Sequence, residues 1–261
     1  MLLRALRETR DGLLGLSYPS QCKVCGCAIE SWDDGVACAH CWEDAAITEI
    51  ITGPVCSKCG TPKAPTSVYG QPCETTLRTC GGCGSLPFSA ARACGIYSGA
   101  LEASILFLKS HPHLCRRLRQ LINRTFSQHR SALESDLVIP VPLHHSRERE
   151  RGFNQAEIIS RVISRSFDLP LDDGSLVRAR STERHRAGVD AVDRADSVEA
   201  AFKVVRPRLI KDASILIVDD VMTTGSTIRA VARTLLEYGA LRVAVLTVAR
   251  VAGEPLPLRP R

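Results

Sequence analysis

The stretch Ile215–Thr227, with the sequence ILIVDDVMTTGST, decides the fold. Its first four residues are apolar, which is typical of a strand covered on both faces in a parallel sheet. Two aspartates follow, and then threonine, glycine and serine lead into a helical pattern at Ser226–Tyr238. Gly239 marks the end of this helix, and a second apolar strand is predicted at Val243–Val248. This order of elements predicts an α/β fold with helices on both faces of a parallel sheet.

The same alternation of strands and helices continues upstream of this unit. The patterns predict helices around Leu101–Lys109, Leu114–His129 and Asn154–Ser166, and a buried strand at Leu137–Val141. A short segment around Arg92–Tyr97 has the pattern of a hairpin. We therefore expect one α/β domain over residues 89–252, followed by a tail at 253–261.

The polar part of Ile215–Thr227 has the chemistry of a sugar-phosphate site. Carboxylates at the carboxyl end of a parallel strand face the crevice where α/β proteins bind ligands, and they accept hydrogen bonds from a diol. A glycine-containing loop of small hydroxyl residues before a helix N-terminus binds an anion instead. Ribose 5-phosphate carries both groups. A receiver domain also begins with Asp-Asp, but only 41 residues follow Asp220, which is too few. The chain has neither GxGxxG nor GxxxxGK[ST].

Eight of the twelve cysteines form four Cys-x-x-Cys pairs between residues 22 and 83. Two such turns supply the four thiolates of a structural zinc site, so residues 21–88 are predicted to form a double zinc ribbon. Redox pairs are the alternative, but none of these pairs opens a helix after a strand. Cys27 and Cys73 are possible substitute ligands, and interleaved pairing of the turns stays open. The predicted zinc ligands are Cys22, Cys25, Cys38, Cys41, Cys56, Cys59, Cys80 and Cys83.

Charge is distributed unevenly along the chain. Residues 21–90 carry four basic and seven acidic side chains, a net charge of −3, whereas residues 91–261 carry +8. Two zinc ions, each held by four thiolates, would bring the first module to about −7. Residues 1–20 predict a short amphipathic helix rather than a signal peptide, and no apolar run reaches the ~20 residues that span a bilayer. We expect a cytoplasmic protein that does not contact a membrane.

Position by position, ILIVDDVMTTGST resembles the signature of type I phosphoribosyltransferases. The whole chain, over about residues 20–250, resembles the ComF family of competence-associated proteins, with RGFNQ at Arg151–Gln155 as a further shared motif. The resemblance implies binding of phosphoribosyl pyrophosphate with Mg²⁺, with Asp219 and Asp220 as the catalytic pair on the ribose hydroxyls. It also implies a role in DNA uptake. The implied ligand-binding residues are Asp219, Asp220, Val221, Met222, Thr223, Thr224, Gly225, Ser226 and Thr227.

Transfer of the phosphoribosyl group releases pyrophosphate, whose charge basic side chains must stabilise. The main candidates for this task are Lys109, Arg147 and Arg151, and the further candidates are Arg149, Arg178 and Arg180. Relatives that act on 6-oxopurines have an aspartate as general base at position 223, where this chain has Thr223. We expect a phosphoribosyltransferase with an unidentified acceptor. The alternatives are a non-catalytic factor that processes single-stranded DNA, alone or with other DNA-processing proteins, and a sensor of phosphoribosyl pyrophosphate.

Overall fold

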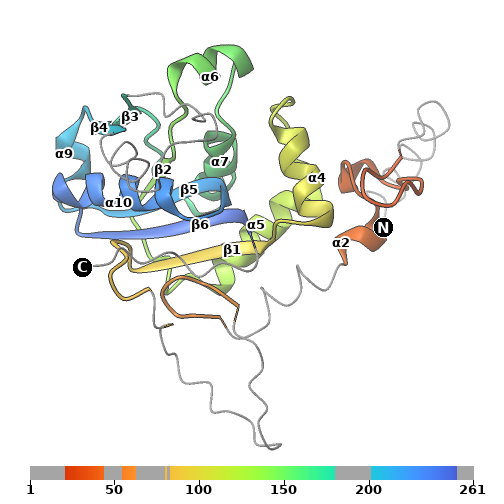
Figure 1. Ribbon diagram of the computed structural model, residues 1–261, viewed down its shortest axis with the longest axis horizontal. Helices are drawn as coiled ribbons and strands as arrows, with labels where there is room; N and C mark the ends of the chain where they lie inside the picture. The colour runs from red at the N-terminus through yellow and green to blue at the C-terminus, as the bar shows by residue number, and fades with distance from the viewer. Residues whose placement is uncertain (1–20, 44–54, 63–79, 81–82, 180–200, 252–261) are drawn as a thin grey trace, which may run out of the picture.

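The computed structural model describes residues 21–43, 55–62, 80, 83–179 and 201–251 (Figure 1). The helix predicted for residues 1–20 and the tail at 253–261 lie outside the described residues. None of the described helices is long and apolar enough to cross a membrane.

A parallel sheet of four strands in the order β1-β6-β5-β2 forms the centre of the fold. The two middle strands pair from Ser214 with Arg242 to Met222 with Arg250. The side chains of Ile215–Val218 are fully buried, because a middle strand of this sheet is covered on both faces. The predicted α/β sheet is confirmed. Its strands are β1 (Ala90–Ile96), β2 (Leu137–Pro140), β5 (Ser214–Met222) and β6 (Arg242–Arg250).

Helices cover both faces of the sheet, as predicted. One core contains Val231 and Leu235 of the C-terminal helix together with Ile215 and Ile217 of β5. The core on the opposite face contains Ile122 from the second long helix, at the apolar spacing of an amphipathic helix. The face with Val231 and Leu235 is covered by α10 (Ser226–Glu237). The opposite face is covered by α4 (Gly99–Leu108), α5 (Arg116–Gln128) and most of α7 (Gln155–Phe167).

Smaller elements surround the central sheet (Figure 1). Helix α6 (His145–Arg151) contains the run of alternating charges Arg147–Arg151 that follows β2, and Gly152 ends the helix with φ 76°. Strands β3 (Leu176–Arg178) and β4 (Phe202–Val204) form an antiparallel pair, which α9 (Pro207–Ile210) follows. The remaining helices are the short η1 (Trp32–Asp34) and α2 (Ala39–Trp42).

Two details of the sequence interpretation need correction. The segment around Arg92–Tyr97 is no hairpin: β1 pairs in parallel with β6, from Ala90 with Ala244 to Ile96 with Arg250. Its partner lies about 150 residues away, so a local pattern cannot reveal it. Strand β5 also continues past its predicted end to Met222, because Asp219 still pairs with Thr247 of β6. The two aspartates are therefore the last part of the strand rather than the start of a loop.

Candidate functional site

The Asp219–Asp220 pair is held by the backbone that immediately follows each residue. The N–H of Asp220 donates to Asp219 Oδ1 at 2.9 Å, and the N–H of Val221 donates to Asp220 Oδ1 at 2.7 Å. Both side chains are half-buried at the carboxyl edge of the sheet. Each carboxylate is thereby oriented through one oxygen, and its second oxygen can accept from a ligand hydroxyl.

The surroundings of the Asp219 carboxylate disfavour its negatively charged form. Burial raises the pKa of this carboxyl well above its ordinary value of 3.8, and the neighbouring charge of Asp220 raises it further. The Asp220 N–H and the positive charge of Arg178 act in the opposite direction. Part of the side chain remains accessible, so a bound diol or cation can reach it. Such a group would stabilise the charged form.

The N-terminus of α10 follows this strand after a short loop. Gly225 precedes the helix with φ 69°, a left-handed conformation that glycine adopts without a Cβ penalty. No side chain caps the helix end, apart from a long 3.4 Å contact from the Ser226 N–H to Thr224 Oγ1. Thr223 and Thr224 are exposed. The first N–H groups of this 12-residue helix, which follow the two carboxylates in the chain, could therefore bind an anion.

Two arginines bring positive charge to the same edge. Arg178 of β3 lies with its guanidinium 5.4 Å from the centre of the Phe202 ring. Burial lowers the pKa of Arg178, the charge of Arg147 on α6 lowers it further, and the charge of Asp219 raises it. The charges of Arg147, Arg178 and Asp219 therefore act on one another. Arg147 and Arg178 were both among the sequence candidates for stabilising the diphosphate.

The other two main basic candidates have different surroundings. Lys109 is the half-buried C-cap of α4, and Arg151 is the last residue of α6. Among the described residues, no hydrogen bond or ion pair joins either side chain to Asp219 or Asp220. Asn154 has a clear structural role in RGFNQ, because it accepts from the Ala156 N–H and donates to the Val141 carbonyl, both at 3.0 Å. The motif thus joins β2 to α7.

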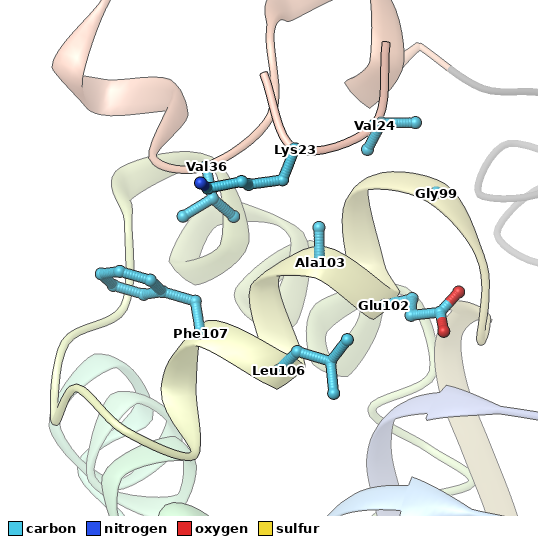
Figure 2. A pocket seen from close by; sticks show the side chains of 8 residues that line it. All are labelled: Lys23, Val24, Val36, Gly99, Glu102, Ala103, Leu106 and Phe107. Carbon is cyan, nitrogen blue, oxygen red and sulfur yellow. The ribbon is translucent and has the colours of Figure 1, made fainter. Parts of the chain in front are cut away.

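Sequence reasoning missed two residues that follow β1. Burial raises the pKa of Tyr97, and the charges of Glu102 and Asp220 raise it further, so the three acidic groups lie near one another. Glu102 also borders a cavity of about 490 Å³ between α4 and the first cysteine turn, which Lys23, Val24, Leu106 and Phe107 line from its two sides (Figure 2). The only signal in the sequence was their position just after a strand of a parallel sheet.

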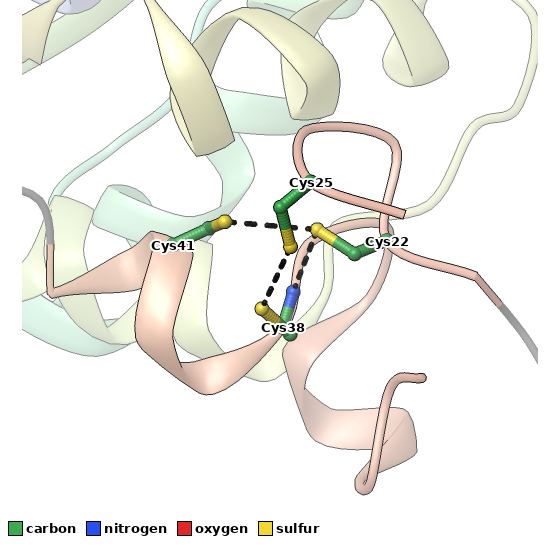
Figure 3. A group of neighbouring side chains, drawn as sticks. All are labelled: Cys22, Cys25, Cys38 and Cys41. Atoms are coloured by element: carbon green, nitrogen blue, oxygen red, sulfur yellow. Dashed lines mark hydrogen bonds between the residues drawn. The ribbon is translucent and has the colours of Figure 1, made fainter. Parts of the chain in front are cut away.

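The first cysteine cluster joins Cys22 and Cys25 to Cys38 and Cys41 (Figure 3). Its Sγ atoms lie within 4.8 Å of one another, with separations of 3.8 Å for Cys22–Cys41 and 3.6 Å for Cys25–Cys38. A tetrahedron of thiolates with Zn–S bonds of ~2.3 Å has edges of about 3.8 Å. The Cys38 N–H also donates to Cys22 Sγ at 3.3 Å. These features fit a zinc ion.

The second cluster joins Cys56 and Cys59 to Cys80 and Cys83 with the same geometry. The Sγ separations are 3.5 Å for Cys56–Cys83 and 3.4 Å for Cys59–Cys80. The turns pair sequentially in both clusters, so the interleaved alternative is wrong. Both clusters could bind zinc through four sulfur atoms, which leaves no open coordination position.

The two clusters belong to opposite sides of the sheet. Cys22 and Cys38 are part of the core with α4 and α5, whereas Cys56 and Cys59 are part of the core with α10. The Ala91 N–H at the free edge of β1 donates to the Lys58 carbonyl at 2.6 Å. The second cluster is therefore attached directly to the sheet.

A family model described as phosphoribosyl transferase domain matches residues 111–259. The chain belongs to the phosphoribosyl transferase domain family. The match includes β2, α6, β5, the Asp219–Asp220 pair and α10, which together form the site described above.

Relatives confirm the resemblance to the ComF family. Competence protein F of Haemophilus influenzae is 35% identical over 116 residues, which cover 44% of this chain and 50% of that protein. The match thus spans about half the length of that relative. DNA utilization protein YhgH of Salmonella typhimurium is 27% identical over 90% of this chain and 99% of its own length. A glutamine phosphoribosylpyrophosphate amidotransferase from B. subtilis, solved with ADP and GMP, matches 50% of this chain and 26% of its own with 20% identity and a TM-score of 0.35.

Proposed function

We propose that this protein binds phosphoribosyl pyrophosphate at the carboxyl edge of β5 and transfers its phosphoribosyl group to an acceptor. The observation that carries the proposal is the direct succession of the Asp219–Asp220 pair and the uncapped N-terminus of α10. The carboxylates would accept from the two ribose hydroxyls, and the N–H groups after Gly225 would hold the 5′-phosphate. Family membership supports this assignment.

The arginines beside Asp219 suit the leaving diphosphate. Arg147 and Arg178 lie close enough for their charges to repel each other, and a bound diphosphate would offset this repulsion. Bond cleavage at C1 places positive charge on the ribose ring and negative charge on the diphosphate. Asp219 and Asp220 would stabilise the positive charge on the ribose ring, and the two arginines would stabilise the negative charge on the diphosphate. Both charges are larger in the transition state than in the bound substrate, so these interactions would lower the barrier to transfer.

Mg²⁺ would accompany the diphosphate rather than occupy a dedicated protein cage. Among the described residues, the metal-ligand groups of three or more side chains are the two cysteine clusters. Magnesium characteristically binds to one or two carboxylates together with substrate phosphates, and Asp219 and Asp220 can supply the carboxylates. When bound, the ion would neutralise charge on the diphosphate.

Calorimetry with phosphoribosyl pyrophosphate and Mg²⁺ tests the binding step. We expect a 1:1 complex with the wild type and no detectable binding after combined Asp219→Asn and Asp220→Asn substitution. Asp168→Asn, on an exposed residue at the end of α7, is the matched control and should leave affinity unchanged. Equal binding by all three proteins would refute the assignment of the site.

Release of pyrophosphate separates a transferase from a sensor. The purified protein is given phosphoribosyl pyrophosphate, Mg²⁺ and a panel of bases, amines and DNA ends. Transfer predicts release that depends on one class of acceptor and on the two aspartates. Binding without release from any acceptor would instead establish a sensor. The hydroxyl of Thr223 cannot act as a general base at neutral pH. We therefore expect an acceptor that does not have to be deprotonated by residue 223.

Contact with a nucleic-acid backbone is a second candidate function, favoured by one surface. Helices α5 and α7 lie side by side, with Asn123 Nδ2 donating to Ser166 Oγ at 2.9 Å. Their exposed face is rich in arginine, although Arg161 also pairs with Glu157. Such a face suits phosphates, while the low aromatic content of 5% offers few stacking platforms. The exposed arginines are Arg119, Arg124, Arg130, Arg161 and Arg165.

Salt-dependent binding of single-stranded DNA tests this surface. Replacing Arg119, Arg124 and Arg165 by glutamine should weaken binding and reduce the slope of log K against log salt by about 2. A variant that loses the same charge on another surface, through Lys203, Arg208 and Lys211, should retain most of the affinity. Equal losses in both variants would indicate a general charge effect and count against this surface.

A further inference from the structure

Two arginines are buried in the sheet beside the second cysteine cluster. Arg250 of β6 is 3% exposed and Arg92 of β1 is 8% exposed. Within the described parts of the chain, no carboxylate lies within ion-pair distance of either guanidinium. A buried charge without a partner of opposite sign is strongly unfavourable. The sheet must therefore provide each arginine with another source of negative potential.

The second cysteine cluster is that source. Arg250 Nη1 donates to the Cys59 carbonyl at 2.8 Å, and Arg92 Nη1 donates to the Ala91 carbonyl at 2.7 Å. Burial lowers the pKa of both guanidinium groups, and negative charge on Cys56 and Cys59 raises it. Four thiolates around Zn²⁺ carry a net charge of −2, which two arginines neutralise. The zinc-loaded cluster and the arginines would thus stabilise one another.

Arg250 is also the last residue of β6 and lies beside the end of β5, the strand that carries Asp219 and Asp220. It pairs with Met222, the last residue of β5 before Thr223. The Val251 N–H donates to the Met222 carbonyl at 3.1 Å, and the Tyr97 N–H donates to the Arg250 carbonyl at 2.7 Å. Its backbone therefore joins the ends of β1 and β5, while its side chain reaches the cysteine cluster. Segment 55–62 lies beside β1 in Figure 1.

We propose that Arg250 is a positioning residue that couples zinc in the second cysteine cluster to the conformation of the loop after Met222. With zinc bound, the cluster compensates the guanidinium charge, and the ends of β5 and β6 remain paired. Without zinc, the turn that carries the Cys59 carbonyl is no longer held in place, so the buried guanidinium of Arg250 loses its acceptor and the strand ends separate to let water reach it. Only the identity of the loop's ligand rests on the proposed function; the coupling itself does not.

The first cluster lacks this connection. The arginines near the first cluster pair with carboxylates instead of relying on the cluster for negative charge: Arg116 pairs with Asp33 at 2.9 Å, and Arg117 pairs with Asp34 at 2.7 Å. It packs against α4 and α5 rather than β6. Metal loss from the first cluster should therefore leave the loop after Met222 unchanged.

Metal release and hydrogen exchange test the coupling in the full-length, zinc-loaded protein. A chelator is added, and alkylation followed by mass spectrometry assigns each released ion to its cluster. We expect Arg250→Gln to accelerate release from the second cluster by about tenfold or more, and not from the first. Amides of residues 219–227 should exchange faster in this variant. The same increase should occur in the wild type when the second zinc is removed.

Two variants serve as controls for Arg250→Gln. Arg242 lies at the other end of β6 and also donates to a carbonyl, that of Ala132 at 2.8 Å. Arg242→Gln should change neither zinc release from the second cluster nor exchange at residues 219–227. Arg250→Lys retains the positive charge and should retain slow release. Rapid release from Arg250→Lys would show that charge is not the cause.

The wild-type experiment decides the proposal even if Arg250→Gln fails to fold. Unchanged exchange at residues 219–227 after removal of the second zinc would overturn the coupling. Titration with phosphoribosyl pyrophosphate is a separate arm, in which zinc removal should weaken binding by about tenfold. If the zinc-loaded wild type does not bind this ligand, the proposed function fails, while zinc release and hydrogen exchange still test the coupling.

Discussion

Asp219 is a charged residue in surroundings that favour its neutral form. Its carboxylate is partly withdrawn from water and lies beside a second carboxylate, and both conditions raise its pKa. A ribose diol would donate hydrogen bonds to the charged form and so favour it. The free protein therefore holds an unfavourable charge whose cost the ligand would offset.

We predict that Asp219→Asn stabilises the free protein at neutral pH. The pKa of Asp219 is about 3.8 in the unfolded state and is raised above that value in the folded state. At a pH between the unfolded-state pKa and the folded-state pKa, the folded state therefore binds more protons than the unfolded state. Wild-type stability should therefore fall as pH rises through that window. The variant lacks this loss, and its free energy of unfolding at pH 7 should be higher by on the order of 1 kcal/mol, or about 3 °C in Tm.

Urea unfolding of both proteins across the acidic and neutral range provides the measurement. Below the ordinary aspartate pKa, the two free energies of unfolding should converge, because Asp219 is then protonated in both states. A variant less stable than the wild type at pH 7 would mean that the charge is well compensated in the free protein.

The N-terminal end of α10 is the element on which the proposed phosphate binding depends. Gly225 and Gly239 lie at the two ends of this helix, with φ of 69° and 88°. Alanine at either position strains the backbone and should destabilise the protein by about 1 kcal/mol. Only Gly225→Ala should also weaken binding of phosphoribosyl pyrophosphate, because it shifts the N–H groups that face the phosphate. Calorimetry and thermal unfolding of the two variants distinguish these effects.

The start of α7 is fixed by a buried side chain. Asn154 is 7% exposed and bonds to both the Ala156 N–H and the Val141 carbonyl. Asn154→Ala should lower the free energy of unfolding by about 2 kcal/mol, because a cap is lost and a buried carbonyl loses its donor. His144→Ala, at the half-buried N-cap of α6, should cost less than half as much. Urea unfolding compares the two.

Local signals explain which elements could be predicted. The unit β5–α10–β6 was evident, because an apolar strand, a glycine-containing loop, an amphipathic helix and a terminating Gly239 follow one another in the sequence. The strand around Arg92 was assigned wrongly, because its partner β6 is distant in sequence. Arg250 was missed for the same reason: the Cys59 carbonyl that accepts from it lies 191 residues away.

At the scale of the whole molecule, each face of the sheet includes one cysteine cluster in its core. Spacing alone predicted the two groups of four cysteines, because a Cys-x-x-Cys turn brings its own two thiolates together. Spacing could not indicate that the clusters would lie on opposite faces, since this depends on packing against β1, α4 and α5. The predicted boundary near residue 88 stays a prediction.

The unequal burial of the clusters predicts an order of metal loss. Cys25 of the first cluster is exposed, whereas Cys56, Cys59 and Cys83 of the second are buried. With excess chelator and iodoacetamide, Cys25 should be alkylated several-fold faster than the cysteines of the second cluster. Mass spectrometry of timed digests measures both rates. Equal rates would imply that metal loss requires global unfolding rather than local access.

The hydrogen bond from Ala91 to Lys58 also bears on the solubility of the protein. Strand β1 is an outer strand of the sheet, and Arg92 is the one charged residue in its sequence AARACGI. An outer strand of this kind is a template for pairing with another molecule unless something covers it. The second cysteine turn covers its beginning, where Gly60 allows an approach so close that a Cβ would lie 2.3 Å from the Ala91 oxygen. Zinc starvation of cells that produce this protein should therefore lead to its aggregation through β1.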